Sequence, residues 1–374
     1  MSEKKRVVIG MSGGVDSSVA AALLVAQGYD VIGITIKTYN YDDVGGNAAN
    51  DKSCCSLDGI NDARVVCAEL GIPHYVLDFS KPFRTHVIDM FIDEYMAGNT
   101  PNPCVICNRK IKWEQLIQKG LSIGADYVAM GHYARLSHDT QSGRYWISRG
   151  EDARKDQSYA LWAVSQESLA RTIFPLGAIS KTDARDIATR LGVRTADKQE
   201  SYEICFIPDD DYGRFLRDNV PDIDARLRGG DVMFEGKKIG EHDGYPFYTI
   251  GQRRGLNVAV GEPVYVTEIH AGDNIIEVGR KSDLQQRRFR VRDVTMQKYP
   301  FPEAPLRVEA KIRYKDAPGP ATLIPQADGS LVVEFDEPKT AITRGQSTVW
   351  YDGDDVVGGG IISEIHDGCL LVNI

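Results

Sequence analysis

Apolar and amphipathic segments alternate along the first two hundred residues of the chain. Short apolar runs at residues 7–10, 29–36, 73–78 and 125–132 indicate buried strands, and the segments between them have helical spacing. Strands separated by helices form parallel sheets that are covered on both faces. Residues 1–208 therefore predict an α/β domain with a doubly wound parallel sheet, whose ligands bind at the carboxyl ends of its strands.

The pattern changes after Pro208, where short alternating segments and Gly-rich turns replace the longer runs. Residues 209–280 predict a small central β domain that follows one more helix. Within residues 281–374, repeated short strands and turns predict a C-terminal β-barrel.

A glycine-rich loop follows the first predicted strand and precedes an apolar helix. Its sequence is Ser12-Gly13-Gly14-Val15-Asp16-Ser17-Ser18. A strand, a glycine turn and a helix aim backbone N–H groups and the positive end of the helix at an anion, and paired glycines let the main chain approach it closely. No Gly-Lys-Ser/Thr follows, so this is not a Walker A loop. It predicts phosphate binding of another kind.

Length and composition narrow the class of protein. A chain of 374 residues suggests two or three domains, and its 42% hydrophobic residues can bury a substantial core. No apolar run is long enough to span a membrane and no signal peptide precedes the first strand, so we expect a cytoplasmic protein. Seven cysteines, an odd number, do not suit a secretory disulfide framework and indicate reactive or metal-binding thiols.

The net charge of −9 disfavours general affinity for nucleic acids, but a local basic face can still bind phosphates. Arg288, Arg290 and Arg292 alternate with Phe289 and Val291, so a strand there places three arginines on one face. Such a face is either a nucleic-acid contact or a solvated surface.

Two cysteine segments carry candidate chemistry. Cys104 and Cys107 form a Cys-x-x-Cys pair directly before a predicted helix, whose N-terminus and following basic residues favour the thiolate. By itself the pair suits a redox couple, a zinc half-site or an iron–sulfur half-site. Cys205 lies in an apolar setting. Cys67 and Cys369 are expected in the core, because buried cysteine behaves as a small hydrophobe.

With these segments assembled, the chain closely resembles the bacterial tRNA-specific 2-thiouridylases of the ATP pyrophosphatase (PP-loop) superfamily. The match runs nearly end to end, and many short strings in one order are more specific than the loop alone. These strings are residues 12–18, Thr100-Pro101-Asn102-Pro103, Cys107-Asn108, Gly131-His132-Tyr133, residues 155–159, Glu203-Ile204-Cys205-Phe206, residues 248–256 and Gly345-Gln346.

The resemblance implies ATP-dependent replacement of the C2 oxygen of the wobble uridine of tRNA by sulfur. Adenylation lets that oxygen leave with AMP; Cys205 would carry a persulfide, and Cys107 would be the nucleophile that can form a disulfide with it. The implied partners are tRNA and a sulfur-relay protein that donates the persulfide, with no DNA and no membrane. ATP would bring Mg²⁺, for which only Asp16 is a candidate ligand.

The same resemblance assigns residues to sites. The ATP site would comprise Gly10, Met11, Ser12, Gly13, Gly14, Val15, Asp16, Ser17, Ile36 and Gly131. The target base would meet Asn102, Pro103 and Cys104, with further tRNA contacts at His132, Lys155, Asp156, Gln157, Arg313, Tyr314 and Gln346. Basic side chains suit phosphates and rings suit splayed bases, and a stacked anticodon base must turn outward to reach the thiols.

Cys104 departs from the family pattern, in which many members carry an aspartate that would act as a general acid or base. That role is unassigned in this chain. The change also creates a set of three thiols, Cys104, Cys107 and Cys205, which a second interpretation uses to hold a [4Fe–4S] cluster with one open iron. We favour persulfide chemistry without a cluster, because cluster proteins usually supply a fourth thiolate.

Two other functions are compatible with the sequence. An ATP pyrophosphatase that acts as a ligase on a small molecule would need neither two distant cysteines nor a basic β module. A non-catalytic tRNA-binding protein would bind tRNA without releasing AMP. Formation of AMP, pyrophosphate and 2-thiouridine together separates the three functions. We also expect the face of Arg288, Arg290 and Arg292 to make tRNA binding salt-sensitive.

Overall fold

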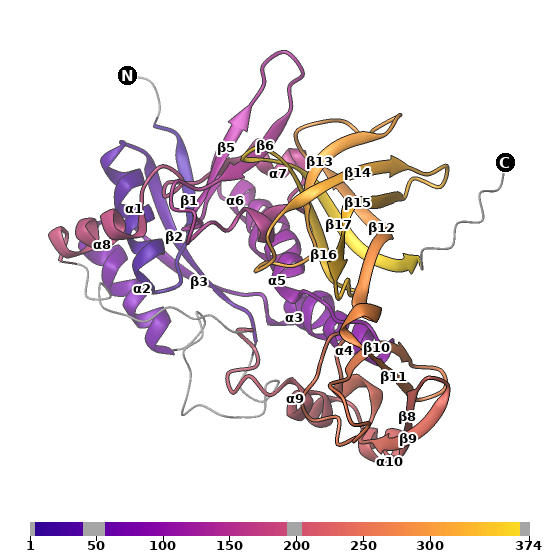
Figure 1. Ribbon diagram of the computed structural model, residues 1–374. Helices are drawn as coiled ribbons and strands as arrows, with labels where there is room; N and C mark the ends of the chain where they lie inside the picture. The colour runs from indigo at the N-terminus through magenta and orange to yellow at the C-terminus, as the bar shows by residue number, and fades with distance from the viewer. Residues whose placement is uncertain (1–3, 40–56, 193–203, 367–374) are drawn as a thin grey trace.

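The N-terminal domain is built on a parallel sheet with strand order β3-β2-β1-β4-β7. The computed structural model describes residues 4–39, 57–192 and 204–366 of the chain. The strands of this sheet are β1 (Arg6–Gly10), β2 (Asp30–Lys37), β3 (His74–Asp78), β4 (Tyr127–Ala129) and β7 (Thr172–Ile173). Helices lie on both sides of the sheet, which confirms the predicted doubly wound α/β fold (Figure 1).

Side chains of the central strand β1 divide between the two faces of the sheet. Val7 and Ile9 pack with α1 (Val15–Ala26), α2 (Leu57–Glu69) and α8 (Lys181–Arg190), whereas Val8 packs with the helices around Trp113. Val7, Val8 and Ile9 are all fully buried. A strand that is apolar on both faces is typical of a parallel sheet between two helical layers.

Two longer helical runs contain π-helical segments, which are frequent at functional sites. The first run comprises α3 (Ser80–Phe83), η3 (Arg84–Ile88) and α4 (Asp89–Met96). The second comprises α5 (Pro103–Ile106), η4 (Cys107–Gln115) and α6 (Leu116–Ser122). None of the helices in the described part of the chain combines the length and the apolar character needed to cross a membrane.

The middle domain places two short helices before a small sheet, where the sequence predicted a single helix and a small β domain. The helices are α9 (Tyr212–Asn219) and α10 (Ile223–Leu227). The sheet has the order β10-β11-β8-β9 around a core that includes Val232, Val266 and Ile276. Its elements are β8 (Gly230–Phe234), β9 (Lys237–His242), η6 (Tyr245–Phe247), β10 (Tyr265–His270) and β11 (Ile275–Gly279).

The C-terminal domain is a closed barrel with strand order β12-β15-β14-β13-β16-β17, because β12 also pairs with β17. The predicted β-barrel is therefore confirmed. On β12, Phe289 and Val291 are fully buried, as the alternation of this strand predicted. The barrel elements are η7 (Lys281–Leu284), β12 (Gln285–Met296), β13 (Leu306–Lys311), β14 (Gly319–Pro325), β15 (Leu331–Thr340), β16 (Ser347–Asp352) and β17 (Asp355–His366).

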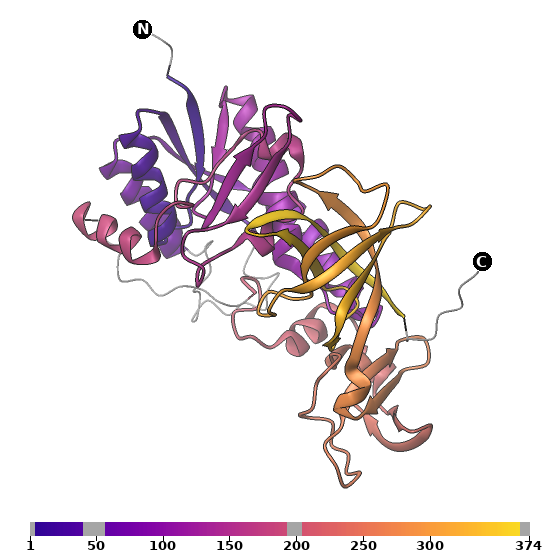
Figure 2. The same cartoon turned by 45° about the horizontal axis from the view of Figure 1, so that its top comes forward.

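A hairpin of the N-terminal domain extends the barrel sheet, which the sequence analysis did not predict. It consists of β5 (Ala134–His138) and β6 (Tyr145–Arg149), with β6 beside β17, and is followed by η5 (Ser158–Leu161) and α7 (Gln166–Leu169) (Figure 2). The fully buried Gln297 stabilises this boundary, because its amide accepts a hydrogen bond from the Ile147 N–H and donates to the carbonyl of Leu161.

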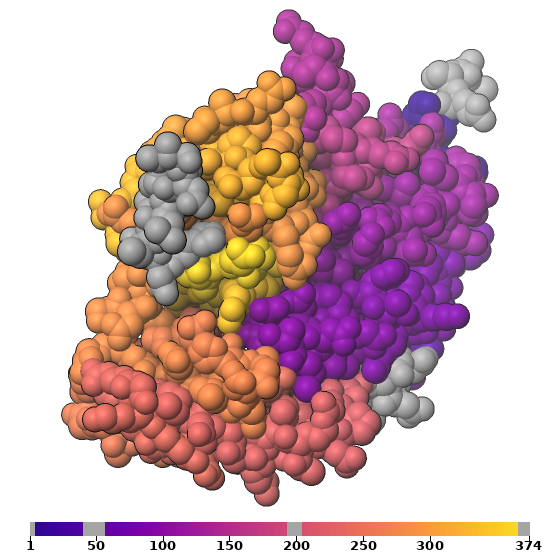
Figure 3. Space-filling model, turned by 90° about the vertical axis from the view of Figure 1, so that its right-hand side faces the viewer, coloured from indigo at the N-terminus to yellow at the C-terminus, as the bar shows by residue number. Residues whose placement is uncertain are grey.

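The three domains meet around residues 94–101, a region that we call the joint. Arg292 of the barrel pairs with Glu94 at 2.7 Å, and Tyr245 of the middle domain donates a hydrogen bond to the carbonyl of Met96 at 2.6 Å. In Figure 3 the purple residues of the N-terminal domain border both the barrel and the middle domain along this side of the molecule. The joint thus couples all three domains through one helix end.

Candidate active site

The glycine-rich loop between β1 and α1 is held by its own side chains. The hydroxyl of Ser17 accepts a hydrogen bond from the Ser12 amide at 3.2 Å and donates one to the Gly14 carbonyl at 3.1 Å. Gly13 has a φ of +70°, and a Cβ atom there would lie 2.1 Å from the carbonyl oxygen of Gly59. Only glycine fits this turn. Gly14 then caps α1, whose N-terminus favours an anion beside the loop.

Residues assigned to the ATP site lie at neighbouring strand ends. Gly131 follows β4, and a Cβ atom on it would lie 2.9 Å from the Ser17 nitrogen. Gly10 ends β1, where a Cβ atom would lie 2.6 Å from the sulfur of Met130. Ile36 lies near the end of β2 and is half-buried. Because β1 lies between β2 and β4, the structure gathers these residues at one edge of the sheet.

Lys181 adds a charged group that the sequence analysis missed. It is only 5% exposed, and its Nζ atom lies 2.6 Å from Asp16 Oδ1, which also accepts a hydrogen bond from the Tyr133 hydroxyl at 2.7 Å. Lys181 begins α8, which Ser180 and Asp183 cap reciprocally. The sequence shows this capping pattern, but it holds no signal that joins Lys181 to a carboxylate 165 positions away.

Cys107 and Cys205 belong to one hydrophobic cluster. Cys107, the first residue of η4, is 8% exposed, and the half-buried Cys205 packs against the same cluster, in which Phe83 and Phe206 are fully or almost fully buried. The hydroxyl of Tyr39 donates a hydrogen bond to the Cys205 carbonyl at 2.8 Å. Two thiols that are distant in the sequence are thus brought into one environment.

The same cluster reaches the ATP edge of the sheet, because Ile36 packs against it. The residues assigned to the target base come directly before Cys107 in the chain. Cys104 is exposed on α5, Pro103 is buried at the start of that helix, and Asn102 precedes it with an extended backbone. The assigned base site and Cys107 therefore lie on consecutive helical segments.

Cys67 and Cys369 are not assigned to the candidate site. Cys67 is fully buried, and burial raises the pKa of its thiol to about 11, which confirms that it is a core residue. Cys369 lies outside the described residues. The described cysteines Cys67, Cys104, Cys107 and Cys205 form no disulfide with one another.

The residues assigned to tRNA contacts come from two domains and meet at their boundary. Tyr314 of the barrel is 46% exposed, and its hydroxyl donates a hydrogen bond to the carbonyl of Asp156 at 3.0 Å. The side-chain amide of Gln346 donates to the carbonyl of Thr100 at 2.8 Å. Arg313 is exposed beside Tyr314. Tertiary packing thus places these residues at the boundary between the N-terminal domain and the barrel.

The turn at residues 155–157 connects this boundary to the ATP edge. The side-chain oxygen of Gln157 accepts a hydrogen bond from the amide of Tyr133 at 3.0 Å, and the Gln157 amide donates to the Tyr133 carbonyl at 3.1 Å. Lys155 in the same turn is half-buried. The turn is therefore fixed to the strand end that carries Gly131.

His132 lies in an aromatic pocket. Its ring centroid is 5.4 Å from that of Trp113, and Phe174 contacts it edge-on. Burial, with the positive charge of Lys112 as a second cause, lowers the pKa of His132 to about 3. The imidazole is neutral at physiological pH, so among the residues assigned to tRNA it is poorly suited to an ionic contact.

Family models and curated relatives cover almost the whole chain. The model of the tRNA methyl transferase HUP domain matches residues 5–209, that of the tRNA methyl transferase PRC-barrel domain residues 215–280, and that of the aminomethyltransferase β-barrel domain residues 286–362. The tRNA-specific 2-thiouridylase MnmA of Salinibacter ruber is 50% identical over 98% of this chain and 96% of its own length. The MnmA of Heliobacterium modesticaldum is 51% identical over 96% of this chain and 92% of its own. The chain belongs to the tRNA-specific 2-thiouridylase family.

Membership of the 2-thiouridylase family confirms the resemblance that the sequence strings carried. The individual site residues stay predictions, and the structure contributes their arrangement. It brings together the assigned ATP residues at one sheet edge, the two thiols in one cluster and the assigned tRNA residues at one domain boundary. His132 is half-buried against Trp113 and Phe174, and Lys181 joins the residues around the phosphate loop.

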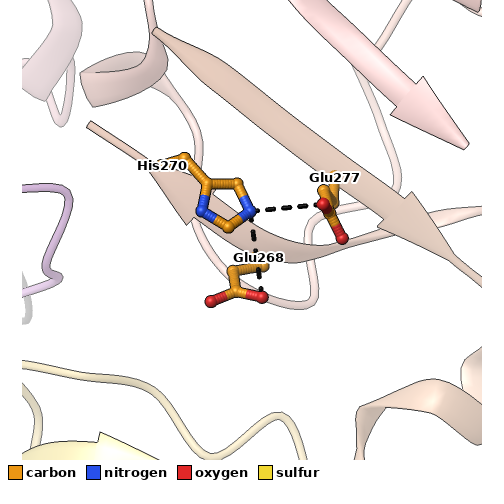
Figure 4. A group of neighbouring side chains, drawn as sticks. All are labelled: Glu268, His270 and Glu277. Carbon is orange, nitrogen blue, oxygen red and sulfur yellow. Dashed lines mark ion pairs between the residues drawn. The ribbon is translucent and has the colours of Figure 1, made fainter. Parts of the chain in front are cut away.

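A group of potential metal ligands lies in another part of this 2-thiouridylase fold, on β10 and β11 of the middle domain (Figure 4). His270 Nε2 is 3.3 Å from a Glu277 oxygen and 3.8 Å from a Glu268 oxygen. Within the described ranges it is the only set of three or more such side chains whose ligand atoms all lie within 4.8 Å. No thiol takes part in this group, so it lies apart from the candidate sulfur chemistry.

Proposed function

We propose that this 2-thiouridylase family member uses ATP to exchange the C2 oxygen of the wobble uridine in tRNA for sulfur. The curated relatives are named for such an activity. The observation that carries the proposal is the single cluster that contains Cys107 and Cys205 and is packed by Ile36 from the ATP edge. The reaction requires a nucleotide and a sulfur donor to reach the same carbon atom, and this packing supports that convergence.

In the first step, the loop at residues 12–18 and the N-terminus of α1 bind the pyrophosphate part of ATP. The C2 oxygen attacks the α-phosphorus, the bond to pyrophosphate breaks, and an adenylated uridine forms. The ion pair with Asp16 holds Lys181 beside the loop. There its ammonium would stabilise negative charge on the leaving pyrophosphate. Mg²⁺ bound with ATP would neutralise phosphate charge, and Asp16 supplies a carboxylate of the type that Mg²⁺ prefers.

In the second step, the outer sulfur of a persulfide on Cys205 attacks C2, and the former C2 oxygen leaves with AMP. The thiolate of Cys107 then attacks the inner sulfur, which breaks the S–S bond and leaves 2-thiouridine and a Cys107–Cys205 disulfide. A dithiol reductant must return two electrons to this disulfide. A persulfide donor protein must also reload Cys205, and we place both reactions in the cytoplasm, where thiols stay reduced.

The tRNA would lie along the boundary between the N-terminal domain and the barrel. Asn102, Pro103 and Cys104 would meet the flipped base beside Cys107. The turn at residues 155–157, with Arg313, Tyr314 and Gln346, would contact the surrounding loop and its phosphates. The hydrogen bonds from Tyr314 to Asp156 and from Gln346 to Thr100 support this assignment, because they join the assigned residues across the two domains.

A [4Fe–4S] cluster at Cys104, Cys107 and Cys205 is the second interpretation, and thiolates are the ligands that such clusters use. The packing of Cys107 and Cys205 among phenylalanines fits the two-thiol chemistry better, since Cys104 is exposed outside that cluster. Anaerobic purification with iron and sulfide analysis tests this point. Stoichiometric iron that is lost in Cys104→Ser would overturn our preference.

The test of the function is a reaction of the purified chain with ATP, a persulfide donor and unmodified tRNA that carries a wobble uridine. AMP, pyrophosphate and 2-thiouridine should appear in equal amounts. Cys205→Ser should abolish 2-thiouridine, while the matched Cys67→Ser change in the core should affect stability only. AMP without any dependence on tRNA would favour a small-molecule ligase, and tRNA binding without AMP would favour a non-catalytic binding protein.

A further inference from the structure

Lys311, the last residue of β13, is a half-buried ammonium group held by aromatic rings. Its Nζ atom lies 5.7 Å from the ring centroid of Tyr159 and 5.8 Å from that of Tyr314. Neither an ion pair nor a hydrogen bond joins Lys311 to a carboxylate in the described residues. Burial lowers the pKa of Lys311, and the nearby Arg149 lowers it further. A charge removed from water without an ionic partner costs free energy.

The carboxylates whose charges act on Lys311, by raising its pKa, are those of Asp156 and Asp316. Both are engaged with other groups. Asp156 accepts hydrogen bonds from the amides of Gly150 and Ser158, and from the Ser158 hydroxyl at 2.9 Å. Asp316 pairs with Lys339 at 3.1 Å. The fold therefore leaves the Lys311 charge for a partner from outside the chain.

The surroundings of Lys311 indicate what that partner is. The Tyr314 ring above it donates its hydroxyl to the Asp156 carbonyl, and the Tyr159 hydroxyl donates to the carbonyl of Ser347, the neighbour of Gln346. Lys311 thus lies among the residues assigned to tRNA from both domains. We propose that Lys311 binds a backbone phosphate of the bound tRNA between the turn at residues 155–157 and the barrel. This inference rests on the proposed function, which makes tRNA the ligand.

A phosphate would supply the missing negative charge, and the exposed ring of Tyr314 would give an adjacent base a stacking surface. Each phosphate contact releases counterions from the tRNA. The loss of one contact therefore changes the salt dependence of tRNA binding as well as the affinity. This separates an ionic contact with RNA from a purely structural role of Lys311 under the two rings.

The experiment measures the tRNA dissociation constant of the full chain at several salt concentrations. Lys311→Met keeps the apolar stem but removes the charge, and should lower the slope of log K against log salt by about 0.7 to 0.9. Lys311→Arg should keep the slope. Lys339→Met is the matched control, because Lys339 lies on the same barrel over the ring of Phe335 but is paired with Asp316. Its slope should equal that of the wild type.

A Lys311→Met chain with the wild-type slope would overturn the proposal. If that variant does not fold, acylation of lysines in the wild-type chain decides instead, since tRNA should protect Lys311 and leave Lys339 reactive. Equal protection of both, or of neither, would also contradict it. A wild-type chain that binds no tRNA at any salt concentration would refute the proposed function itself, which is a different outcome.

Discussion

The phosphate loop and the joint are assembled in different ways. The loop is one segment, residues 12–18, and the hydrogen bonds of Ser17 that shape it stay inside that segment. The joint collects Glu94, Met96 and Thr100 from one domain and holds them with side chains of the other two. Neighbours in sequence therefore set the hydrogen bonds within the loop, although Gly59 and Lys181 also contact it. The joint, in contrast, exists only after the domains have packed.

This difference separates two measurable properties. Changes at the loop should impair AMP formation and leave tRNA affinity intact, because ATP chemistry depends on local backbone geometry. Changes along the joint and its tRNA edge should weaken tRNA binding and leave the loop intact. A variant that alters both properties equally would show that the two regions act as one unit.

The largest effect is expected from Lys181→Met. The change removes the ammonium beside Asp16 while keeping the buried stem, so that leaving-group charge is no longer stabilised. AMP formation at saturating tRNA should fall roughly 300-fold, and tRNA affinity should stay unchanged. The measurement is AMP release from labelled ATP, together with a tRNA dissociation constant.

Lys5→Met is the matched control for Lys181→Met. Lys5 also forms a lysine–aspartate pair in this domain, with Asp126 at 2.8 Å, but the pair is largely exposed and lies at the amino end of β1. Such a pair contributes about 0–1 kcal/mol, and AMP formation should not change. Wild-type AMP formation in Lys181→Met would mean that Lys181 only stabilises the fold.

The second effect comes from Gly13→Ala. The added Cβ would overlap the carbonyl of Gly59, so the loop or α2 must shift. Misplacement of the phosphate site by about 1 Å should lower AMP formation roughly 100-fold. Gly143→Ala tests the backbone strain alone, because Gly143 also has a φ of +70° but nothing lies within 4 Å of its Cβ position. Equal losses in both variants would contradict a steric cause.

The contrast also explains what the sequence could predict. The strand, loop and helix at residues 6–26 depend on apolar spacing and on glycine at Gly13 and Gly14, and both are local properties. The hairpin β5–β6 and its pairing with β17 were not predicted, because the partner strand lies about two hundred residues further on. The contact of Lys181 with Asp16 was missed for the same reason. The packing of Cys107 and Cys205 into one cluster could be expected only through the family resemblance.

A smaller effect is expected from Gln346→Ala at the joint. The variant loses the hydrogen bond to the Thr100 carbonyl, which aligns the barrel with the assigned base site. One such bond contributes about 1 kcal/mol, so tRNA affinity should fall roughly fivefold while AMP formation at saturating tRNA persists. Gln326→Ala is the control, since that side chain donates to the carbonyls of Ile324 and Pro325, its neighbours in the sequence. Impaired AMP formation at saturating tRNA would break the separation of the two regions.

The smallest effect is expected from replacing Arg288, Arg290 and Arg292 together by glutamine. Arg290 is paired with Asp328 and Glu364, and Arg292 with Glu94 and Asp293, so phosphates must compete with these carboxylates. The tRNA affinity of the triple variant should fall no more than about threefold. Its slope of log K against log salt should also decrease, and Arg288→Gln alone should account for most of that decrease. A salt titration of tRNA binding checks both. An unchanged slope in the triple variant would make the arginine face a solvated surface, and the ionic part of tRNA binding would then lie along the boundary at Lys311.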